Sequence, residues 1–204
     1  MNQGTLYLIA APSGAGKTSL VKALLEKTQN IRVSVSHTTR PARPGEQNGI
    51  NYHFVSKAEF QQMLSDKVFL EHAQVFDNYY GTSGKWVTEQ LNTGIDVILE
   101  IDWQGAQQIR SIQPDTISIF ILPPSLATLE QRLQDRGKDS QEVIAKRLRG
   151  AVEEMSHNTE FDYIVVNEDF DQALKDLQAI IHSQSLKQAT QAKKLQGLLN
   201  ELLN

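Results

Sequence analysis

The stretch that decides the fold of this chain is Ala11-Pro12-Ser13-Gly14-Ala15-Gly16-Lys17-Thr18. It follows a short apolar run, Leu6–Ala10, and precedes a stretch with helical patterning, Ser19–Thr28. A strand, a glycine-rich turn and a Gly-Lys-Thr sequence that opens a helix together form a phosphate-binding loop. The alternative, a chance loop beside a helix cap, is disfavoured because both flanking elements are present.

Each part of this loop suits an anionic ligand. Small residues let backbone N–H groups curl around a phosphate, and the helix N-terminus adds a partial positive charge and unpaired donors. Lys17 can reach the β- and γ-phosphates of a nucleotide, and the Thr18 hydroxyl can ligate Mg²⁺. Ala11 stands where the pattern has its first glycine, and it fits if the backbone there keeps a negative φ.

Composition narrows the class of protein. The chain has 204 residues, which suits one domain with insertions. Its net charge of −4 gives no global basic field for nucleic acid. The absence of cysteine excludes disulfides, thiolate metal sites and a cysteine nucleophile. The N-terminal apolar run is too short for a signal or a membrane span, so we expect a soluble, cytoplasmic protein without a nucleic-acid or membrane partner.

Apolar runs alternate with amphipathic stretches along most of the chain. Buried strands are predicted at Leu6–Ala10, Val97–Ile101, Ile117–Leu122 and Tyr163–Val166. Helices are predicted at Ser19–Thr28, Gly105–Ile112, Leu126–Asp135, Gln141–His157 and Asp171–Lys187. This alternation indicates an α/β protein with a central parallel sheet covered on both faces, a three-layer P-loop NTPase fold. Its ligand belongs at the carboxyl ends of the strands, where the loop also lies.

Two segments depart from the alternation. Residues 34–86 combine short strands (Val33–Ser36, Tyr52–Val55), a helix at Lys57–Ser65 and a hairpin over Val68–Thr82, which indicates a small, mostly antiparallel insertion. Residues 125–156 are helical and charged, with Gly137 as a break and Asp139 or Ser140 as a cap, and form a predicted lid. The core domain is then 1–33, 87–124 and 157–204.

Charged side chains gather in three further places. The strand ending in Glu100 and Asp102 resembles those that lie beside a phosphate loop and help hold Mg²⁺, with Glu100 and Thr18 as its candidate ligands. Arg40 and Arg43 lie in a loop stiffened by prolines, and their guanidinium forks match phosphate oxygens. An ordinary surface acid and a solvated loop are the alternatives.

The predicted lid also carries Arg132, Arg136 and Arg147, which could stabilise the charge of a phosphoryl group in transfer. The alternative is a surface helix with ordinary i,i+4 ion pairs. Tyr52 and Tyr80 are either hydroxyl donors to a phosphate or half-buried strand aromatics.

Taken together, these residues resemble the guanylate kinase family, in its bacterial form. Its long motif is matched by Thr38-Thr39-Arg40, Arg43, Glu46, Gly49, Tyr52 and Phe54-Val55. Further matches follow in the family's order: Glu71-His72-Ala73, Asn78–Thr82, Ile101–Gly105, the Arg132/Arg136 pair and Val165-Val166-Asn167. The resemblance runs from about Gly4 to Lys187. Glu100 departs from it, since many members have Asp there.

The resemblance implies transfer of a phosphoryl group from ATP to GMP, and to dGMP, with Mg²⁺. The matching positions for GMP are Ser36, Arg40, Arg43, Glu46, Tyr52, Glu71, Tyr80, Thr82 and Asp102. Ala11–Thr18 would hold the ATP phosphates, Asn167 would lie near the adenine, and the lid arginines would reach in on closure. Residues 34–86 would be the GMP-binding region.

Base recognition has a physical rationale. Guanine presents the adjacent donors N1–H and N2–H₂ beside the O6 acceptor, so a carboxylate such as Glu71 can accept from both, and Ser36 and Thr82 can donate to O6. An exposed acid on a hairpin is the alternative for Glu71. Two rival functions remain: a kinase-like module that binds proteins without catalysis, and a kinase for another nucleotide or phosphorylated metabolite.

The C-terminal segment from Ser183 has a helical pattern and carries no chemical motif. Its leucines form an apolar stripe, Leu195, Leu198, Leu199, Leu202 and Leu203. Such a stripe predicts packing on the core or on a second subunit, and it would allow a homo-oligomer, dimer or higher.

Overall fold

The computed structural model describes residues 3–75, 77–135 and 141–203. Its central sheet has five strands in the order β2-β7-β1-β8-β9, and every neighbouring pair is parallel. The strands are β1 (Leu6–Ala10), β2 (Ile31–Val33), β7 (Asp96–Glu100), β8 (Ile117–Leu122) and β9 (Tyr163–Val166). The predicted α/β class and parallel sheet are therefore confirmed, although β2 was not among the strands predicted for this sheet.

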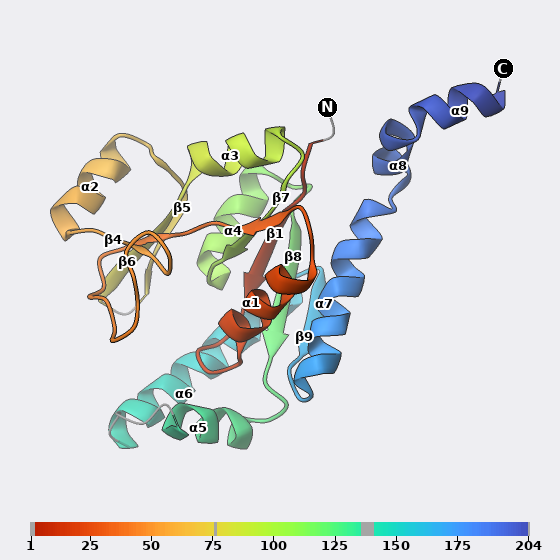
Figure 1. Cartoon of the computed structure of the whole chain (residues 1–204). Coiled ribbons are helices and arrows are strands. Elements are labelled where there is room, and N and C mark those ends of the chain that lie inside the picture. The colour runs from red at the N-terminus through yellow and green to blue at the C-terminus, as the bar shows by residue number, and fades with distance from the viewer. Residues whose placement is uncertain (1–2, 76, 136–140, 204) are drawn as a thin grey trace.

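Helices cover both faces of this sheet (Figure 1). On one face Tyr7 and Ile9 of β1 pack with α1 (Lys17–Lys27) and α7 (Phe170–Ser185). On the other face Leu6 and Leu8 pack with α3 (Gly84–Asn92) and α4 (Trp103–Ile112). Side chains of a strand alternate between faces, so a strand buried on both sides must be apolar throughout, as β1 is. Helix α3 was not among the predicted elements.

A second sheet forms beside the first, in the order β4-β3-β6-β5. Its strands are β3 (His37–Thr38), β4 (His53–Phe54), β5 (Phe69–Val75) and β6 (Asn78–Ser83), and α2 (Lys57–Ser65) precedes the β5–β6 hairpin. The β3–β4 pair is parallel and the other pairs are antiparallel, which agrees with a mixed insertion.

The predicted strand Val33–Ser36 is wrong. Val33 ends β2 in the first sheet, and the second sheet begins only at His37. Between them the Ser34 N–H still donates to the Ile98 carbonyl at 2.9 Å, while the Ser36 carbonyl accepts from the His53 N–H. The chain passes from the first sheet to the second across residues 34–36, because the two ends of this segment bond to different partners.

Two helices lie beyond the carboxyl ends of β8 and β1, namely α5 (Leu126–Asp135) and α6 (Gln141–Ser156). They pack on each other through Leu129, Leu133, Ile144 and Ala151. The short 3₁₀ helix η1 (His157–Glu160) leads from α6 to β9. Gly137, Asp139 and Ser140, the predicted break and caps, lie outside the described residues, as does Arg136.

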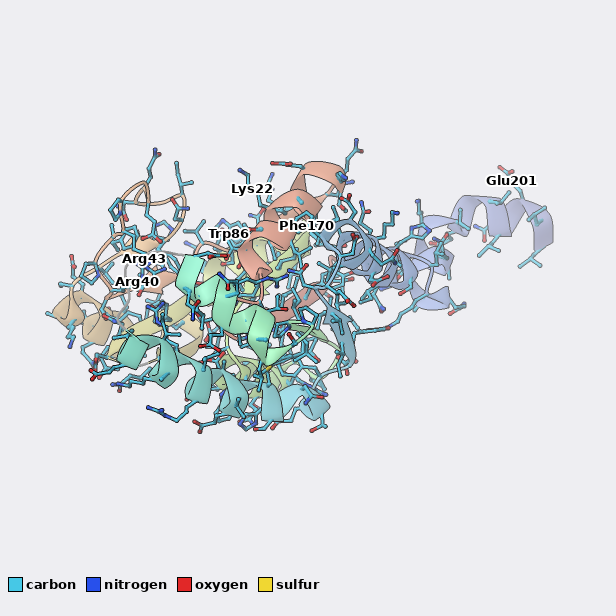
Figure 2. All side chains as sticks on the ribbon, turned by 90° about the horizontal axis from the view of Figure 1, so that it is seen from below. Lys22, Arg40, Arg43, Trp86, Phe170 and Glu201 are labelled. Carbon is cyan, nitrogen blue, oxygen red and sulfur yellow. The ribbon has the colours of Figure 1, made fainter. Side chains whose placement is uncertain are left out.

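The C-terminal tail continues as α8 (Gln188–Lys194) and α9 (Gln196–Leu203), which lead away from the rest of the molecule (Figures 1 and 2). Neither helix has a buried residue, and Leu202 and Leu203 are 70% and 82% exposed. Packing of the stripe on the core is thus wrong, because α8 and α9 project past the end of the sheet; packing on a second subunit stays a prediction. In the part of the chain described here, no helix is long and apolar enough to cross a membrane.

Candidate active site

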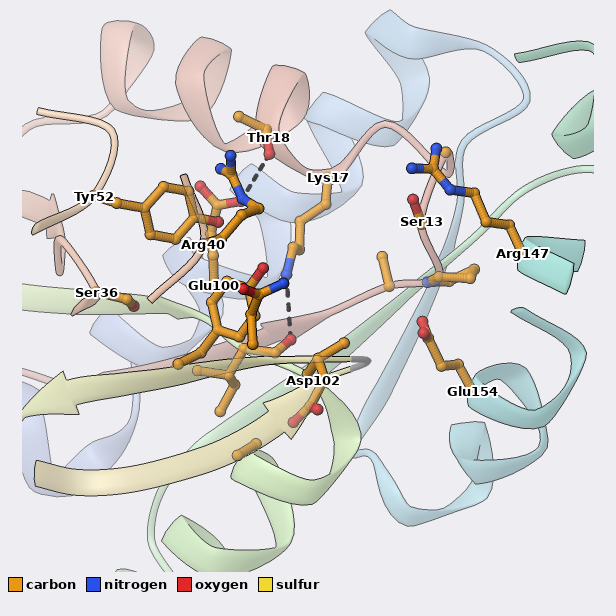
Figure 3. A pocket seen from close by; sticks show the side chains of 18 of the residues that line it. Ser13, Lys17, Thr18, Ser36, Arg40, Tyr52, Glu100, Asp102, Arg147 and Glu154 are labelled. Carbon is orange, nitrogen blue, oxygen red and sulfur yellow. Dashed lines mark hydrogen bonds between the residues drawn. The ribbon is translucent and has the colours of Figure 1, made fainter. Parts of the chain in front are cut away.

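A cavity of about 600 Å³ opens at the carboxyl ends of β1 and β7, between the phosphate loop, the second sheet and α6 (Figure 3). Sixteen of the predicted site residues line it: Ala11, Pro12, Ser13, Gly14, Gly16, Lys17, Thr18, Ser36, Arg40, Arg43, Tyr52, Glu71, Tyr80, Glu100, Asp102 and Arg147. Glu46, Thr82 and Ala15 hydrogen-bond to lining residues, namely Arg40, Glu71 and Pro12. Arg132 and Asn167 in turn donate to the Ala15 carbonyl.

The loop has the backbone that an anion site requires. Gly14 and Gly16 have φ angles of 100° and 96°, a region that favours glycine. Gly16 is the N-cap of α1, and among the described residues no side chain caps that helix. Its first N–H groups therefore remain available for a phosphate. Ala11 is not among the described residues with positive φ, so alanine fits where the pattern has glycine.

Lys17 and Thr18 meet the end of the neighbouring strand. Because β1 and β7 pair in parallel with Ile9 opposite Glu100, the end of β7 lies beside the start of α1. The Lys17 ammonium donates to the Ile101 carbonyl at 3.2 Å, and the Thr18 hydroxyl donates to Glu100 Oε2 at 3.1 Å. The two predicted Mg²⁺ ligands are thus in contact, and both offer the hard oxygens that this ion prefers.

Asn167 and Arg132 hold the loop from behind. Asn167 follows β9 and is buried; its Nδ2 donates to the Ala15 carbonyl at 2.7 Å. Arg132 of α5 donates to the carbonyls of Ala15 and Asn167 at 3.3 and 3.0 Å. A side chain at Gly16 would collide with the Asn167 amide. The expected contact of Asn167 with a base stays a prediction, whereas its support of the loop was not foreseen.

Glu71 on β5 lies deep in the cavity and is only 4% exposed. Its Oε1 accepts from the Thr82 hydroxyl at 2.6 Å, and Thr82 Oγ1 lies 3.4 Å from Ser36 Oγ. Burial raises the pKa of Glu71 to about 7; the Thr82 hydrogen bond opposes this, Asp102 adds to it, and Lys17 opposes it. The carboxylate is therefore poised to lose or gain a proton near neutral pH. An exposed acid, the alternative for Glu71, is excluded.

The place of Glu71 depends on a glycine. Gly105 lies in the first turn of α4, where its N–H donates to Asp102 Oδ1 at 2.9 Å. A Cβ added at Gly105 would lie 2.6 Å from Glu71 Oε2 and 3.3 Å from its carboxyl carbon. The cap by Asp102 fixes the helix end, and the missing side chain leaves room for the carboxylate.

The arginine loop is organised by one acid. Glu46 Oε1 accepts from Arg40 Nη2 at 2.8 Å, and Glu46 Oε2 accepts from the Arg43 N–H at 2.7 Å. The Arg40 guanidinium also lies 5.4 Å from the centre of the Tyr52 ring. Arg40 and Arg43 lie close together at the edge of the insertion (Figure 2). Glu46 thus orients the Arg40 side chain and fixes the backbone at Arg43, so it positions the loop and does not line the cavity itself.

A carboxylate that sequence reasoning missed completes the cavity. Glu154 lines it from α6, with Val143, Lys146 and Arg147. Burial raises the pKa of Glu154 to about 7. Its spacing of seven residues from Arg147 places both on one helical face, which is the signal that could have found it.

Comparisons with known proteins agree with this architecture. The family model described as guanylate kinase matches residues 3–184. The chain is 57% identical to the guanylate kinase of Vibrio parahaemolyticus, over all of this chain and 99% of that one, and 56% identical to that of Methylococcus capsulatus over the full length of both. The crystal structure of guanylate kinase from Anaplasma phagocytophilum superposes with a TM-score of 0.78 at 35% identity, covering 92% of this chain and 89% of that one.

Proposed function

The chain belongs to the guanylate kinase family, and we propose that it transfers the γ-phosphoryl group of ATP to GMP, and to dGMP, giving ADP and GDP or dGDP. One observation carries this proposal: the phosphate loop and the buried Glu71 face the same cavity of about 600 Å³. One end suits a nucleotide triphosphate, and the other suits the donor edge of guanine. A donor and an acceptor nucleotide can therefore meet there.

Different segments of the chain bind GMP, bind ATP and close over the site. Residues 34–86 bind GMP, with Glu71, Ser36 and Thr82 on the base, Asp102 beside them, and Arg40, Arg43, Tyr52 and Tyr80 on the phosphate. The loop holds the ATP phosphates, Asn167 lies near the adenine, and residues 125–156 close as a lid that brings in Arg132, Arg136 and Arg147. Arg132 now bonds backbone carbonyls of the loop, so this role requires it to turn when the lid closes.

The reaction needs positioning and electrostatics more than covalent chemistry. A GMP phosphate oxygen attacks the γ-phosphorus in line, and no enzyme intermediate or general base is required because that oxygen is already anionic. Lys17 and the lid arginines stabilise the charge that spreads over the moving group. Lid closure excludes water, so ATP hydrolysis without GMP is expected to be slow.

Mg²⁺ fits this site as the ion that accompanies ATP. Within the described residues no cluster of three or more ligating side chains could hold a metal alone. Thr18 and Glu100 supply two ligating side chains, partly through water. That is how Mg²⁺ commonly binds, since it keeps several waters and takes further ligands from the phosphates of its substrate.

The discriminating experiment is an acceptor panel. With ATP and Mg²⁺, we expect rapid phosphorylation of GMP and dGMP and little or none of AMP, UMP and CMP, measured as ADP release. Folded protein that phosphorylates another acceptor in preference to GMP would contradict the proposed substrate. Protein that phosphorylates none of them would favour a binding module.

Replacing Gly105 by alanine tests how the base site is built. The added methyl group would displace the Glu71 carboxylate, which Thr82 holds, so we expect the KM for GMP to rise by about tenfold or more. The KM for ATP should change little, because the loop is untouched. A matched control is Gly150→Ala, where an added Cβ meets nothing within 4 Å. Equal KM values for GMP in Gly105→Ala and wild type would contradict this explanation of the base site.

The proposal extends to the cellular location of the protein and to its oligomeric state. We propose a cytoplasmic enzyme, where ATP is plentiful, with ATP and GMP as its partners and neither nucleic acid nor membrane. The exposed leucine stripe of α9 would suit self-association into a dimer or larger homo-oligomer. Its solution mass, compared with that of a chain ending after α7, tests this.

A further inference from the structure

Glu154 has no role in the transfer described above, yet it lines the reaction cavity. It lies on α6, three residues before η1, and points toward the phosphate loop (Figure 3). Arg147 lies about two turns earlier on the same face, roughly 10 Å away along the helix. Helix α6 thus carries a cation, Arg147, near its middle and a carboxylate, Glu154, near its C-terminal end, where η1 connects it to β9. When a lid closes, the residues near its attachment to the core move least. Glu154 should therefore stay beside the phosphate loop.

The charges around Glu154 come from several elements. Burial is the largest influence on its pKa and raises it; Lys17 on α1 opposes this, while Asp102 and Glu153 add to it. The resulting pKa is about 7. Lys17 is therefore the cation that favours the ionised form of Glu154 in this structure.

The other nearby charges have partners or lie further off. From α5, Arg132 donates to two backbone carbonyls. From η1, His157 bonds Glu160 and stacks on Trp103. Lys146 and Arg147 share the cavity but lie two turns up α6.

Nucleotide phosphates would change this balance. Their negative charge disfavours the ionised form of a neighbouring carboxylate, and a partly buried site screens this repulsion less than water does. Lys17 would turn to the phosphates and stop stabilising the ionised form. A protonated carboxyl, by contrast, can donate a hydrogen bond to a phosphate oxygen.

We propose that Glu154 is a further substrate-binding residue, which takes up one proton from solvent when ATP enters and donates it in a hydrogen bond to a phosphate oxygen. The proton returns to solvent when the nucleotide leaves. This inference rests on the proposed function, because it requires ATP in the loop.

Proton uptake can be measured directly. We would titrate wild type with a non-hydrolysable ATP analogue and Mg²⁺ between pH 7.5 and 9, where nucleotide phosphates are fully ionised. Isothermal titration calorimetry in two buffers of different ionisation enthalpy counts the protons. We expect the Kd to rise about tenfold per pH unit and proton uptake to approach one per analogue at pH 8.5.

Two variants test whether Glu154 acts as a protonated hydrogen-bond donor or has another role. Glu154→Gln keeps a donor without titrating, so its Kd should be flat with pH, its proton uptake absent, and its binding at pH 8.5 at least as tight as wild type. Glu154→Leu lacks the donor and should bind more weakly than Glu154→Gln. The matched control is Glu142→Gln, an exposed acid at the far end of the same helix, which should keep the wild-type pH slope.

The outcomes distinguish the two proposals. A wild type that binds the analogue without proton uptake overturns the role of Glu154 and leaves the kinase proposal intact. A Glu154→Gln variant that keeps the wild-type slope overturns that role in the same way. A wild type that binds no analogue and phosphorylates no GMP overturns both.

Discussion

Lys17→Met is expected to lower kcat for GMP phosphorylation by at least about a hundredfold, and up to about a thousandfold. The ammonium lies at the start of α1 inside the cavity, where it can contact the β- and γ-phosphates. Methionine keeps most of the length of the side chain and removes its charge, so stabilisation of the transferring group is lost. Steady-state rates of ADP release at saturating ATP and GMP measure the effect.

The control for this variant is Lys22→Met, an exposed lysine on the same helix (Figure 2). It should keep wild-type turnover. Folding should survive in both, because among the described residues the Lys17 side chain makes one hydrogen bond, to the Ile101 carbonyl. Near-normal turnover of Lys17→Met would mean that the loop does not hold the transferred phosphate.

The second large effect is expected for Glu71→Gln, which should lower kcat/KM for GMP by about thirtyfold or more. A buried carboxylate can accept from both guanine donors, and its mismatch with adenine is worth roughly 2–5 kcal/mol. Glutamine offers one acceptor and sets its NH₂ group against the other donor. Preference for GMP over AMP should therefore fall sharply, measured as the ratio of kcat/KM values.

The same residue predicts a pH dependence of GMP binding. The ionised carboxylate binds the guanine donors, and burial raises the pKa of Glu71 to about 7. GMP affinity should therefore rise with pH through 7, with a Kd about tenfold weaker at pH 6 than its plateau above pH 8. This slope is opposite in sign to that expected for ATP at Glu154. Titration of GMP alone, without ATP, separates the two.

Glu71→Gln should abolish the pH slope, whereas Glu89→Gln, on the exposed face of α3, should keep it. If GMP preference over AMP were unchanged in Glu71→Gln, Glu71 would not read the base. A pH slope that persisted in this variant would assign the titration to another group.

Local sequence patterns were sufficient to predict most strands of the central sheet. Strands β1, β8 and β9 begin and end at the predicted residues, because short apolar runs rich in β-branched residues and bounded by polar breaks have few other uses in a parallel sheet. Helix α3 and strand β2 escaped notice. Nothing local distinguishes Ile31–Val33 from the extended residues after it; only pairing with β7 does.

What the sequence by itself determined is the chemistry that a contiguous motif carries. The loop Ala11–Thr18, the acid at the end of β7 and the paired arginines each predict a ligand from residue type and spacing. These features are local, since a phosphate is held by consecutive N–H groups and by side chains next to them.

What only the tertiary structure decided are contacts between segments far apart in the chain. Gly105 makes room for Glu71, Asn167 supports the loop, and Glu154 reaches the same cavity from α6. The predicted packing of the C-terminal leucine stripe on the core was wrong for the same reason. The sequence shows that the stripe is apolar, but it does not show which surface the stripe contacts. A side chain's role in a site depends on burial and on neighbours in space, and chain folding alone brings those together.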